Sequence, residues 1–176
     1  RYTADLTNIL SAYAFKQDGR FIYLSSEAVY GRSYSSDIHE TEPASAKSFQ
    51  AMALLQGENI CRSYRDTRGM DTRILRFDHM YGIPRKGKTD RNPCFWMTLE
   101  MLKTNQIAAN SRTVFSMIYQ DDAVAFAYRA MMEESPKYPL YHITSGEAIT
   151  QMDLAELIRQ NADGVEIRDD TVGEGF

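Results

Sequence analysis

The chain has 176 residues, of which 43% are hydrophobic and 25% charged, and its formal net charge at pH 7 is −4. This balance is typical of one soluble globular domain, and the negative charge argues against nucleic acid as a partner. No run approaches the roughly 20 apolar residues of a membrane span, and no signal peptide is visible, so we expect a cytoplasmic protein. Two isolated cysteines and three scattered histidines predict reduced thiols and no metal site.

The first half of the chain alternates helical and strand patterns. Apolar residues at helical spacing predict a helix over about residues 2–16, and the run 21–24, apolar on both faces, predicts a strand of a parallel sheet. Turn-forming residues over 32–44 indicate a loop. A long helix is predicted over about 45–68 and a second strand over 72–75, with Gly69 as the cap between them. The apolar stripe expected on the long helix consists of Phe49, Met52, Leu55, Ile60 and Tyr64.

The second half continues the alternation. We expect a helix over 92–102, a strand over 114–118, and a helix through residue 132 that Asp121 or Asp122 N-caps. A strand over 141–144 and a last helix capped by Thr150 follow, with Leu154, Leu157 and Ile158 facing inward. Strands alternating with helices favour an α/β architecture.

Five short segments carry a recognisable pattern in a fixed order. Ser-Ser at 25–26 with Val-Tyr-Gly at 29–31 is the most informative of them, because a buried strand ends in the two serines. The others are residues 5–10, Ile-Leu-Arg-Phe at 74–77 with Tyr-Gly at 81–82, residues 118–125, and residues 141–146 with the helix that follows. In order and spacing they resemble the extended short-chain dehydrogenase/reductase family, the NAD-dependent nucleotide-sugar epimerases and dehydratases.

The resemblance implies an α/β fold: a partial Rossmann-like parallel sheet with helices on its faces, plus part of the small C-terminal substrate domain. Residues 1–84 would form the C-terminal half of an NAD(P)-binding domain. Residues 85–176 would supply substrate-domain segments interleaved with the last core elements. The glycine-rich loop that holds the dinucleotide phosphates in this family does not occur in the chain. We therefore expect a fragment of a longer protein, which would bind NAD or NADP, whereas this chain alone would bind neither.

The resemblance also implies roles for particular residues. Ser26 would polarise a sugar oxygen as a catalytic residue. Since ligands of open α/β sheets lie beyond the carboxyl ends of the strands, Ser26 and His79 are expected on the same sheet edge, near one cleft. The residues expected to bind the cofactor are Leu24, Ser25 and Phe77, and those expected to bind the substrate are Glu27, His79, Tyr81 and Arg112.

The family's Tyr-x-x-x-Lys pair is not found at the expected place. In that pair the ammonium lowers the pKa of the tyrosine, which then acts as a general base. Counting back from Glu58, which fits the family's helix glutamate, places Gln50 in the tyrosine position and Leu54 in the lysine position. Neither side chain titrates usefully, so we expect a degenerate active site.

Several of these residues also have a structural interpretation. Ser26 either contacts a substrate or satisfies backbone groups at a strand end. His79 is either an acid–base group, which its ordinary pKa would suit, or a residue that lines a pocket. Asp121 and Asp122 are better explained as helix-capping residues than as a catalytic carboxylate pair.

Two functions are compatible with this pattern. The first is an NAD(P)-dependent nucleotide-sugar epimerase, dehydratase or reductase with a divergent active site. The second is a non-catalytic relative that binds a dinucleotide or sugar nucleotide and acts as a sensor or assembly subunit. The resemblance further implies a homodimer through the helices at 2–16 and 45–68, with Leu6, Tyr13 and Met52 at the interface.

Overall fold

The computed structural model describes residues 2–14, 19–31, 38–83 and 92–170. These residues form two compact units. Unit 1 contains described residues of 2–31, together with 38–78 and 121–143, and unit 2 contains described residues of 79–120 together with 144–170. Each unit has sheets of its own.

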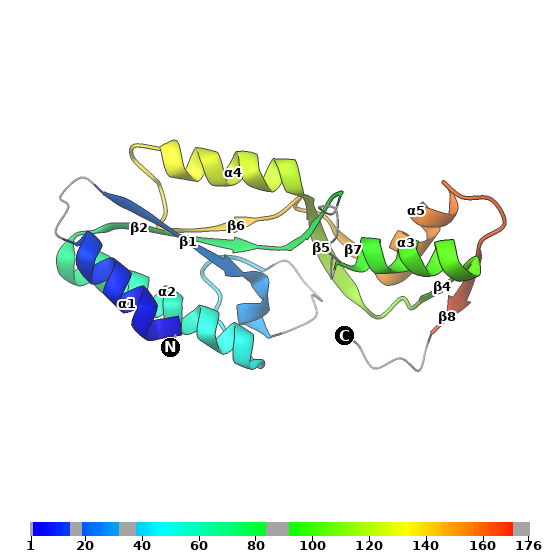
Figure 1. Ribbon diagram of the computed structural model, residues 1–176, viewed down its shortest axis with the longest axis horizontal. Helices are drawn as coiled ribbons and strands as arrows, with labels where there is room; N and C mark the ends of the chain where they lie inside the picture. Colours follow the sequence, from blue (N-terminus) through cyan, green and yellow to red (C-terminus); the bar gives the residue numbers. More distant parts are fainter. Residues whose placement is uncertain (1, 15–18, 32–37, 84–91, 171–176) are drawn as a thin grey trace. The chain divides into compact units, whose positions relative to one another are not determined.

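Unit 1 is built on a parallel three-stranded sheet, as the sequence predicts. Its strand order is β1 (Arg20–Ser26), β2 (Asp71–Phe77) and β6 (Leu140–Ile143), and among the described residues β1 pairs with β2 alone. The helices α1 (Tyr2–Tyr13) and α2 (Phe49–Arg68) cover one face, and α4 (Gln120–Met132) covers the other (Figure 1). The predicted α/β layering of this unit is therefore confirmed.

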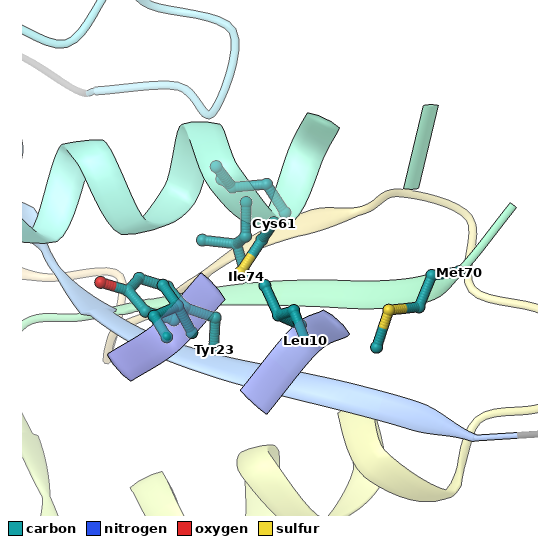
Figure 2. Close-up of a cluster of buried hydrophobic side chains, with 7 residues drawn as sticks. Leu10, Tyr23, Cys61, Met70 and Ile74 are labelled. Atoms are coloured by element: carbon teal, nitrogen blue, oxygen red, sulfur yellow. The ribbon is translucent and has the colours of Figure 1, made fainter. Parts of the chain in front are cut away.

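The core of unit 1 lies between the sheet and the two helices α1 and α2 (Figure 2). The helices contact each other, and the hydroxyls of Ser11 and Tyr64 share a 2.6 Å hydrogen bond across them. A Cβ at Gly57 would lie 2.0 Å from the Tyr23 hydroxyl, so the glycine lets α2 approach β1 closely. The buried residues that form this apolar cluster are Leu6, Leu10, Tyr23, Cys61, Met70, Ile74 and Leu140.

The helix α2 begins later than the sequence predicts, and only part of its predicted apolar stripe packs against the core. Ser48 is its N-cap, with its side chain accepting a 3.1 Å hydrogen bond from the N–H of Ala51. Gly69 ends it at φ +66°, as predicted. The predicted apolar stripe is wrong at its first two members, since Phe49 is 92% and Met52 44% exposed. Its last two members, Ile60 and Tyr64, pack against the core of unit 1. The residues of α2 that are buried are Ala51, Gly57, Glu58 and Cys61.

The described residues of unit 2 form two helices packed on short strands. The helices are α3 (Pro93–Thr104) and α5 (Gln151–Arg159). The strands are β3 (His79–Tyr81), β4 (Gln106–Ala109), β5 (Val114–Tyr119), β7 (Ala148–Thr150) and β8 (Glu166–Asp169). They form a β3-β5-β7 sheet, in which β7 runs antiparallel to β5, and a parallel β4-β8 pair. The main cluster of buried apolar residues in this unit is formed by Met97, Ile107, Ala109, Phe115, Leu154, Ala155 and Val165.

The helix starts of the second half agree only partly with prediction. Thr150 caps α5 in a capping box with Asp153, as expected. The predicted cap of α4 is wrong: α4 begins at Gln120, so Asp121 and Asp122 lie in its first turn, where a negative charge favours the helix dipole. Leu157 was expected to face inward and is half exposed instead.

Candidate functional site

Ser26 lies at the carboxyl end of β1, directly before the short 3-10 helix η1 (Glu27–Tyr30). Its hydroxyl accepts a 3.2 Å hydrogen bond from the N–H of Ala28 and donates a 2.7 Å hydrogen bond to Glu27 Oε2. Ser26 therefore serves as the N-cap of η1. The serine thus satisfies a backbone N–H at the strand end, and the same hydrogen bonds fix its hydroxyl at the end of the sheet.

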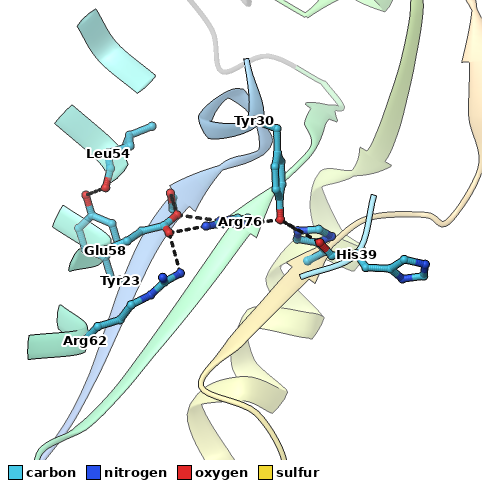
Figure 3. A network of polar contacts seen from close by, with 9 residues as sticks. Tyr23, Tyr30, His39, Leu54, Glu58, Arg62 and Arg76 are labelled. Atoms are coloured by element: carbon cyan, nitrogen blue, oxygen red, sulfur yellow. Dashed lines mark hydrogen bonds and ion pairs between the residues drawn. The ribbon is translucent and has the colours of Figure 1, made fainter. Parts of the chain in front are cut away.

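A buried ion pair lies beside this strand end and links α2 to β2 (Figure 3). Arg76 and Glu58 have side chains only 2% and 0% exposed, and two hydrogen bonds of 2.9 and 2.6 Å join the guanidinium to the carboxylate. Ser25 donates a 2.6 Å hydrogen bond to the same carboxylate, and Arg62 approaches it at 3.3 Å. Because charges are costly to bury unless they are paired, this geometry fixes the helix against the strand.

Tyr30 extends the network to the next strand. Its hydroxyl accepts a hydrogen bond from Arg76, whose guanidinium carbon lies 4.7 Å from the ring centroid. The same oxygen lies 2.7 Å from Nε2 of His142 on β6 and 3.3 Å from the carbonyl oxygen of His39. The network thus joins α2, β2, η1 and β6 through side chains.

The electrostatics of this network make Tyr30 an unsuitable general base. Burial raises the pKa of the Tyr30 hydroxyl, and the opposing effect of Arg76 does not cancel it. Burial lowers the pKa of Arg76, but the contacts with Glu58 and Tyr30 together outweigh this effect, so its pKa is raised as well. The phenol is therefore protonated and the guanidinium charged at neutral pH.

Gln50 and Leu54 lie one turn apart at the start of α2. Gln50 is exposed, whereas Leu54 is half-buried and packs against the core of unit 1. The backbone carbonyl of Leu54 accepts a 3.1 Å hydrogen bond from the Tyr23 hydroxyl, whose pKa burial raises. The two residues share one face of the helix, as a Tyr-x-x-x-Lys pair would.

The residues predicted to bind the cofactor lie together at the carboxyl end of the sheet in unit 1. Phe77 pairs with Ser26 in the register of β1 and β2. Leu24 is 58% exposed, while Ser25 is buried and its hydroxyl donates a hydrogen bond to the Glu58 carboxylate. Leu24 thus offers an exposed apolar side chain one residue before the serine pair.

Of the residues predicted to bind substrate, Glu27 lies in unit 1 and the other three in unit 2. His79 and Tyr81 are the first and last residues of β3, which pairs with β5. The ring centroid of His79 lies 6.0 Å from that of Phe115, and the ring centroid of Tyr81 lies 5.5 Å from that of Tyr119. Arg112 is exposed, in the turn between β4 and β5. Ser26 and His79 belong to different sheets, which corrects the expectation of one sheet edge; a shared cleft stays a prediction.

Sequence reasoning did not assign roles to Arg76 and His142, although both lie inside the quoted motifs. The signal was present, because an arginine inside the apolar run of residues 74–77 must find a buried acidic partner. That partner is Glu58, 18 residues earlier in the chain. The partner cannot be chosen from sequence alone, since it depends on where α2 crosses β2.

The described residues hold no group of three or more metal-ligating side chains. Cys61 and Cys94 are free thiols, as predicted, and burial raises the pKa of Cys61 to about 12. None of the helices in the described ranges has the length and hydropathy that a membrane span requires.

Known proteins resemble this chain in sequence and in fold. A model of the NAD dependent epimerase/dehydratase family matches residues 1–143. The low-salt glycan biosynthesis protein Agl12 of Haloferax volcanii is 25% identical over 147 residues, covering 84% of this chain and 47% of that protein. Protein y4nG of Sinorhizobium fredii is also 25% identical, over 82% of this chain and 35% of its own length.

Solved structures also match nearly the whole of this fold. UDP-glucuronic acid 4-epimerase from Bacillus cereus, in complex with UDP-glucuronic acid and NAD, has a TM-score of 0.81 at 18% identity, over 96% of this chain and 54% of that one. The NAD-dependent NDP-hexosamine 5,6-dehydratase TunA has a TM-score of 0.80 at 16% identity, over 96% and 56%. At this identity the likeness concerns the fold alone.

The fold and the family model together define the class of protein: an α/β protein with the Rossmann-like layering of the epimerases and dehydratases. The chain belongs to the NAD dependent epimerase/dehydratase family. It spans about half the length or less of the curated relatives it matches.

Proposed function

We propose that the protein containing this chain is an NAD(P)-dependent, nucleotide-sugar epimerase- or dehydratase-like protein with a divergent active site. The position of Ser26 carries the proposal. Its hydroxyl is fixed at the carboxyl end of a parallel sheet, where ligands of such sheets lie. A serine held there can hydrogen-bond a sugar hydroxyl or carbonyl while remaining the cap of η1.

The proposal that the active site is divergent rests on two residues of α2. In this proposal Gln50 and Leu54 occupy the positions of the family's tyrosine and lysine, one turn apart on the same helix face. An amide side chain does not transfer protons at neutral pH, and an aliphatic one carries no charge to lower the pKa of a phenol. Reactions that need this pair should therefore be slow, since a general acid–base group contributes about 10²–10⁴-fold.

The test assays the full-length protein with NAD or NADP and a panel of UDP-, GDP- and dTDP-sugars. The double variant Q50Y/L54K restores the pair, and Q50F/L54K is its matched control without the phenol hydroxyl. We expect low turnover by the wild type, a gain in Q50Y/L54K, and no gain in Q50F/L54K. Wild-type turnover as fast as that of the restored variant would overturn the divergent-site proposal, and His79→Ala would then test the replacement base.

A non-catalytic role is the second candidate, and the packing of Leu54 against the core favours it. A lysine at position 54 would place its ammonium group against the apolar core, where an unpaired charge is costly. This position therefore suits leucine better than lysine. In this case the protein would bind a dinucleotide or sugar nucleotide without converting it. Binding measured by calorimetry, with no turnover by either the wild type or Q50Y/L54K, would favour this role.

Cofactor binding is proposed for the full-length protein and not for this chain alone. Leu24, Ser25 and Phe77 offer one wall of a site at the end of the sheet. NAD or NADP, when bound, would supply hydride transfer, while these residues would only position it. Equilibrium dialysis should detect no tight binding of NAD to the 176-residue chain, and tight binding would overturn this part of the proposal.

We also propose a homodimer through α1 and α2. Ile9 and Met52 expose apolar side chains on these helices, as do Tyr2 and Phe49. Leu6, which the sequence placed at the interface, is instead buried in the core of unit 1. Light scattering should give the mass of a dimer, and Met52→Glu should convert it to a monomer.

A further inference from the structure

The short helix η1 determines the direction of the Ser26 hydroxyl. Both groups that bind this hydroxyl belong to η1: the N–H of Ala28 donates to it at 3.2 Å, and the Glu27 carboxylate accepts from it at 2.7 Å. Backbone pairing with Phe77 fixes where Ser26 lies in the sheet, but it leaves the side chain a choice of staggered rotamers. The orientation of this hydroxyl therefore depends on how firmly η1 is held.

The side chain of Tyr30 anchors the far end of η1. A 3-10 helix of four residues has few hydrogen bonds of its own, and its buried side chains are those of Val29 and Tyr30. Val29 contributes apolar burial, which has no preferred direction. The Tyr30 hydroxyl accepts a hydrogen bond from Arg76 on β2 (Figure 3) and lies 2.7 Å from Nε2 of His142 on β6. Because hydrogen bonds are directional, these contacts fix the tyrosine against two strands of the sheet.

The residue before Ser26 is held by the same buried ion pair. Ser25 donates a 2.6 Å hydrogen bond to the Glu58 carboxylate, which two bonds of 2.9 and 2.6 Å join to the Arg76 guanidinium. The side chains of Glu58 and Arg76 are 0% and 2% exposed, so neither can leave without an unpaired charge remaining buried. Residues 25–30 are thus bonded at both ends to one fixed pair, with the Ser26 hydroxyl between the two anchors.

We propose that Tyr30 is a positioning residue for Ser26. Its hydroxyl acts through Arg76 and His142 to hold η1, and η1 in turn keeps the Ser26 hydroxyl in the rotamer that the structure shows. A hydroxyl that is already oriented does not have to be ordered when a sugar binds. The contact between Ser26 and a sugar nucleotide rests on the proposed function, whereas the holding of η1 does not.

Hydrogen–deuterium exchange of the full-length protein tests the anchor. Tyr30→Phe keeps the buried ring and removes only the hydroxyl, so the amides of residues 27–31 should exchange about 3- to 10-fold faster, the range expected for one hydrogen bond. Tyr23→Phe is the matched control. Tyr23 is 5% exposed against 4% for Tyr30, but its hydroxyl binds the Leu54 carbonyl and the Tyr2 hydroxyl, so these amides should not change. Unchanged exchange in Tyr30→Phe would overturn the proposal.

His142→Leu is a second test of the same anchor. It removes one partner of the hydroxyl and leaves Tyr30 in place. The amides of residues 27–31 should exchange faster than in the wild type, but by a smaller factor than in Tyr30→Phe, because Arg76 still donates to the hydroxyl. If Tyr30→Phe does not fold, this variant decides: exchange equal to that of the wild type would contradict the anchor.

A double-mutant cycle with Ser26→Ala tests whether Tyr30 acts through Ser26. The readout is kcat/KM for the sugar nucleotide of the panel that the wild type converts fastest or, if it converts none, the dissociation constant of the one it binds most tightly. Tyr30→Phe should weaken this value about 10-fold, the order of one misplaced hydrogen bond, and should have no further effect once Ser26→Ala is present. Tyr23→Phe should have the same effect in both backgrounds.

The results separate this proposal from the proposed function. Losses that multiply in the double variant would overturn the positioning role of Tyr30. A full-length protein that neither binds nor converts any sugar nucleotide of the panel would instead overturn the proposed function. The positioning of the Ser26 hydroxyl would then be decided by exchange of the Ala28 amide, which is bonded to that hydroxyl.

Discussion

The two units fill their interiors in different ways. Unit 1 buries charge: Glu58 and Arg76 lie in its interior together with Ser25, Thr72 and Arg73. The buried polar residues described in unit 2, which are Asn92, Asn110 and Ser116, carry no charge. Hydrogen bonds and ion pairs are directional, whereas apolar contacts depend mainly on volume. Unit 1 should therefore tolerate changes of volume better than the loss of a polar partner, and unit 2 should show the reverse.

The largest effect is expected for Glu58→Ala in unit 1. Removing the carboxylate leaves the charge of Arg76 buried and unpaired, which should lower the free energy of unfolding by about 3–5 kcal/mol. Urea denaturation followed by circular dichroism measures this. The control is E58M/R76M, in which both charges are absent and the loss should be smaller than in Glu58→Ala. Equal losses in both variants would mean that volume, and not charge, matters at this position.

Ile107→Ala is the corresponding change in unit 2. Ile107 is fully buried on β4, so the truncation should leave a cavity and cost about 2–5 kcal/mol. Fluorescence of Trp96, the single tryptophan, reports on α3 in the same unit. Ile107→Val is the graded control and should cost about 0.5–1.5 kcal/mol. Equal losses of stability in Ile107→Ala and Ile107→Val would contradict the comparison between the two units.

Gly31→Ala tests how tightly the turn after η1 is fixed. Gly31 has φ +66°, and a Cβ there would lie 2.1 Å from the Ser45 carbonyl oxygen. Gly69 has the same φ of +66° but no atom within 4 Å of its Cβ position, so Gly69→Ala isolates the backbone strain of about 1–2 kcal/mol. Gly31→Ala should cost more than Gly69→Ala in thermal denaturation. Equal costs would show that the segment around Ser45 moves aside freely.

The smallest effect is expected for Thr150→Ala at the start of α5. The change removes the capping box with Asp153 and should cost about 0.5–2 kcal/mol. The hydrogen bonds from Thr150 lower the pKa of Asp153, so this pKa should rise in the variant. An NMR titration measures the pKa, with Thr150→Ser as the control that retains the hydroxyl. An unchanged pKa of Asp153 in Thr150→Ala would contradict the hydrogen bonds between Thr150 and Asp153.

Local chemistry was predictable from the sequence, and contacts between distant residues were not. Gly69 and Thr150 end and start helices through bonds to residues within four positions, so their types alone indicate the caps. The start of α4 was misplaced because β5 passes directly into the helix at Gln120, with no residue left to act as a separate cap. The strands β3, β4, β7 and β8 have three or four residues each, too few to show a period.

The errors on α2 have a different cause. The apolar pattern of the sequence predicted that Phe49 is buried, and it indicated no partner for Glu58. In the structure Phe49 is exposed and Glu58 is buried. The burial of Glu58 depends on Arg76, and that pairing exists only after α2 has packed on β2. In the candidate site, the location of Ser26 at a strand end was predictable from its motif. The hydrogen bond from its hydroxyl to Glu27 was not predictable, because it depends on the side-chain orientations at the start of η1.

The open edge of β1 has a consequence for the behaviour of the chain in concentrated solution. Among the described residues this seven-residue strand pairs on one side only, and Leu24 exposes an apolar side chain near its end. A row of unpaired backbone donors and acceptors is a template on which another extended segment can add. When the 176-residue chain is studied alone, crowding should therefore favour intermolecular strand addition along residues 20–26, and the solubility of this chain would depend on that strand edge.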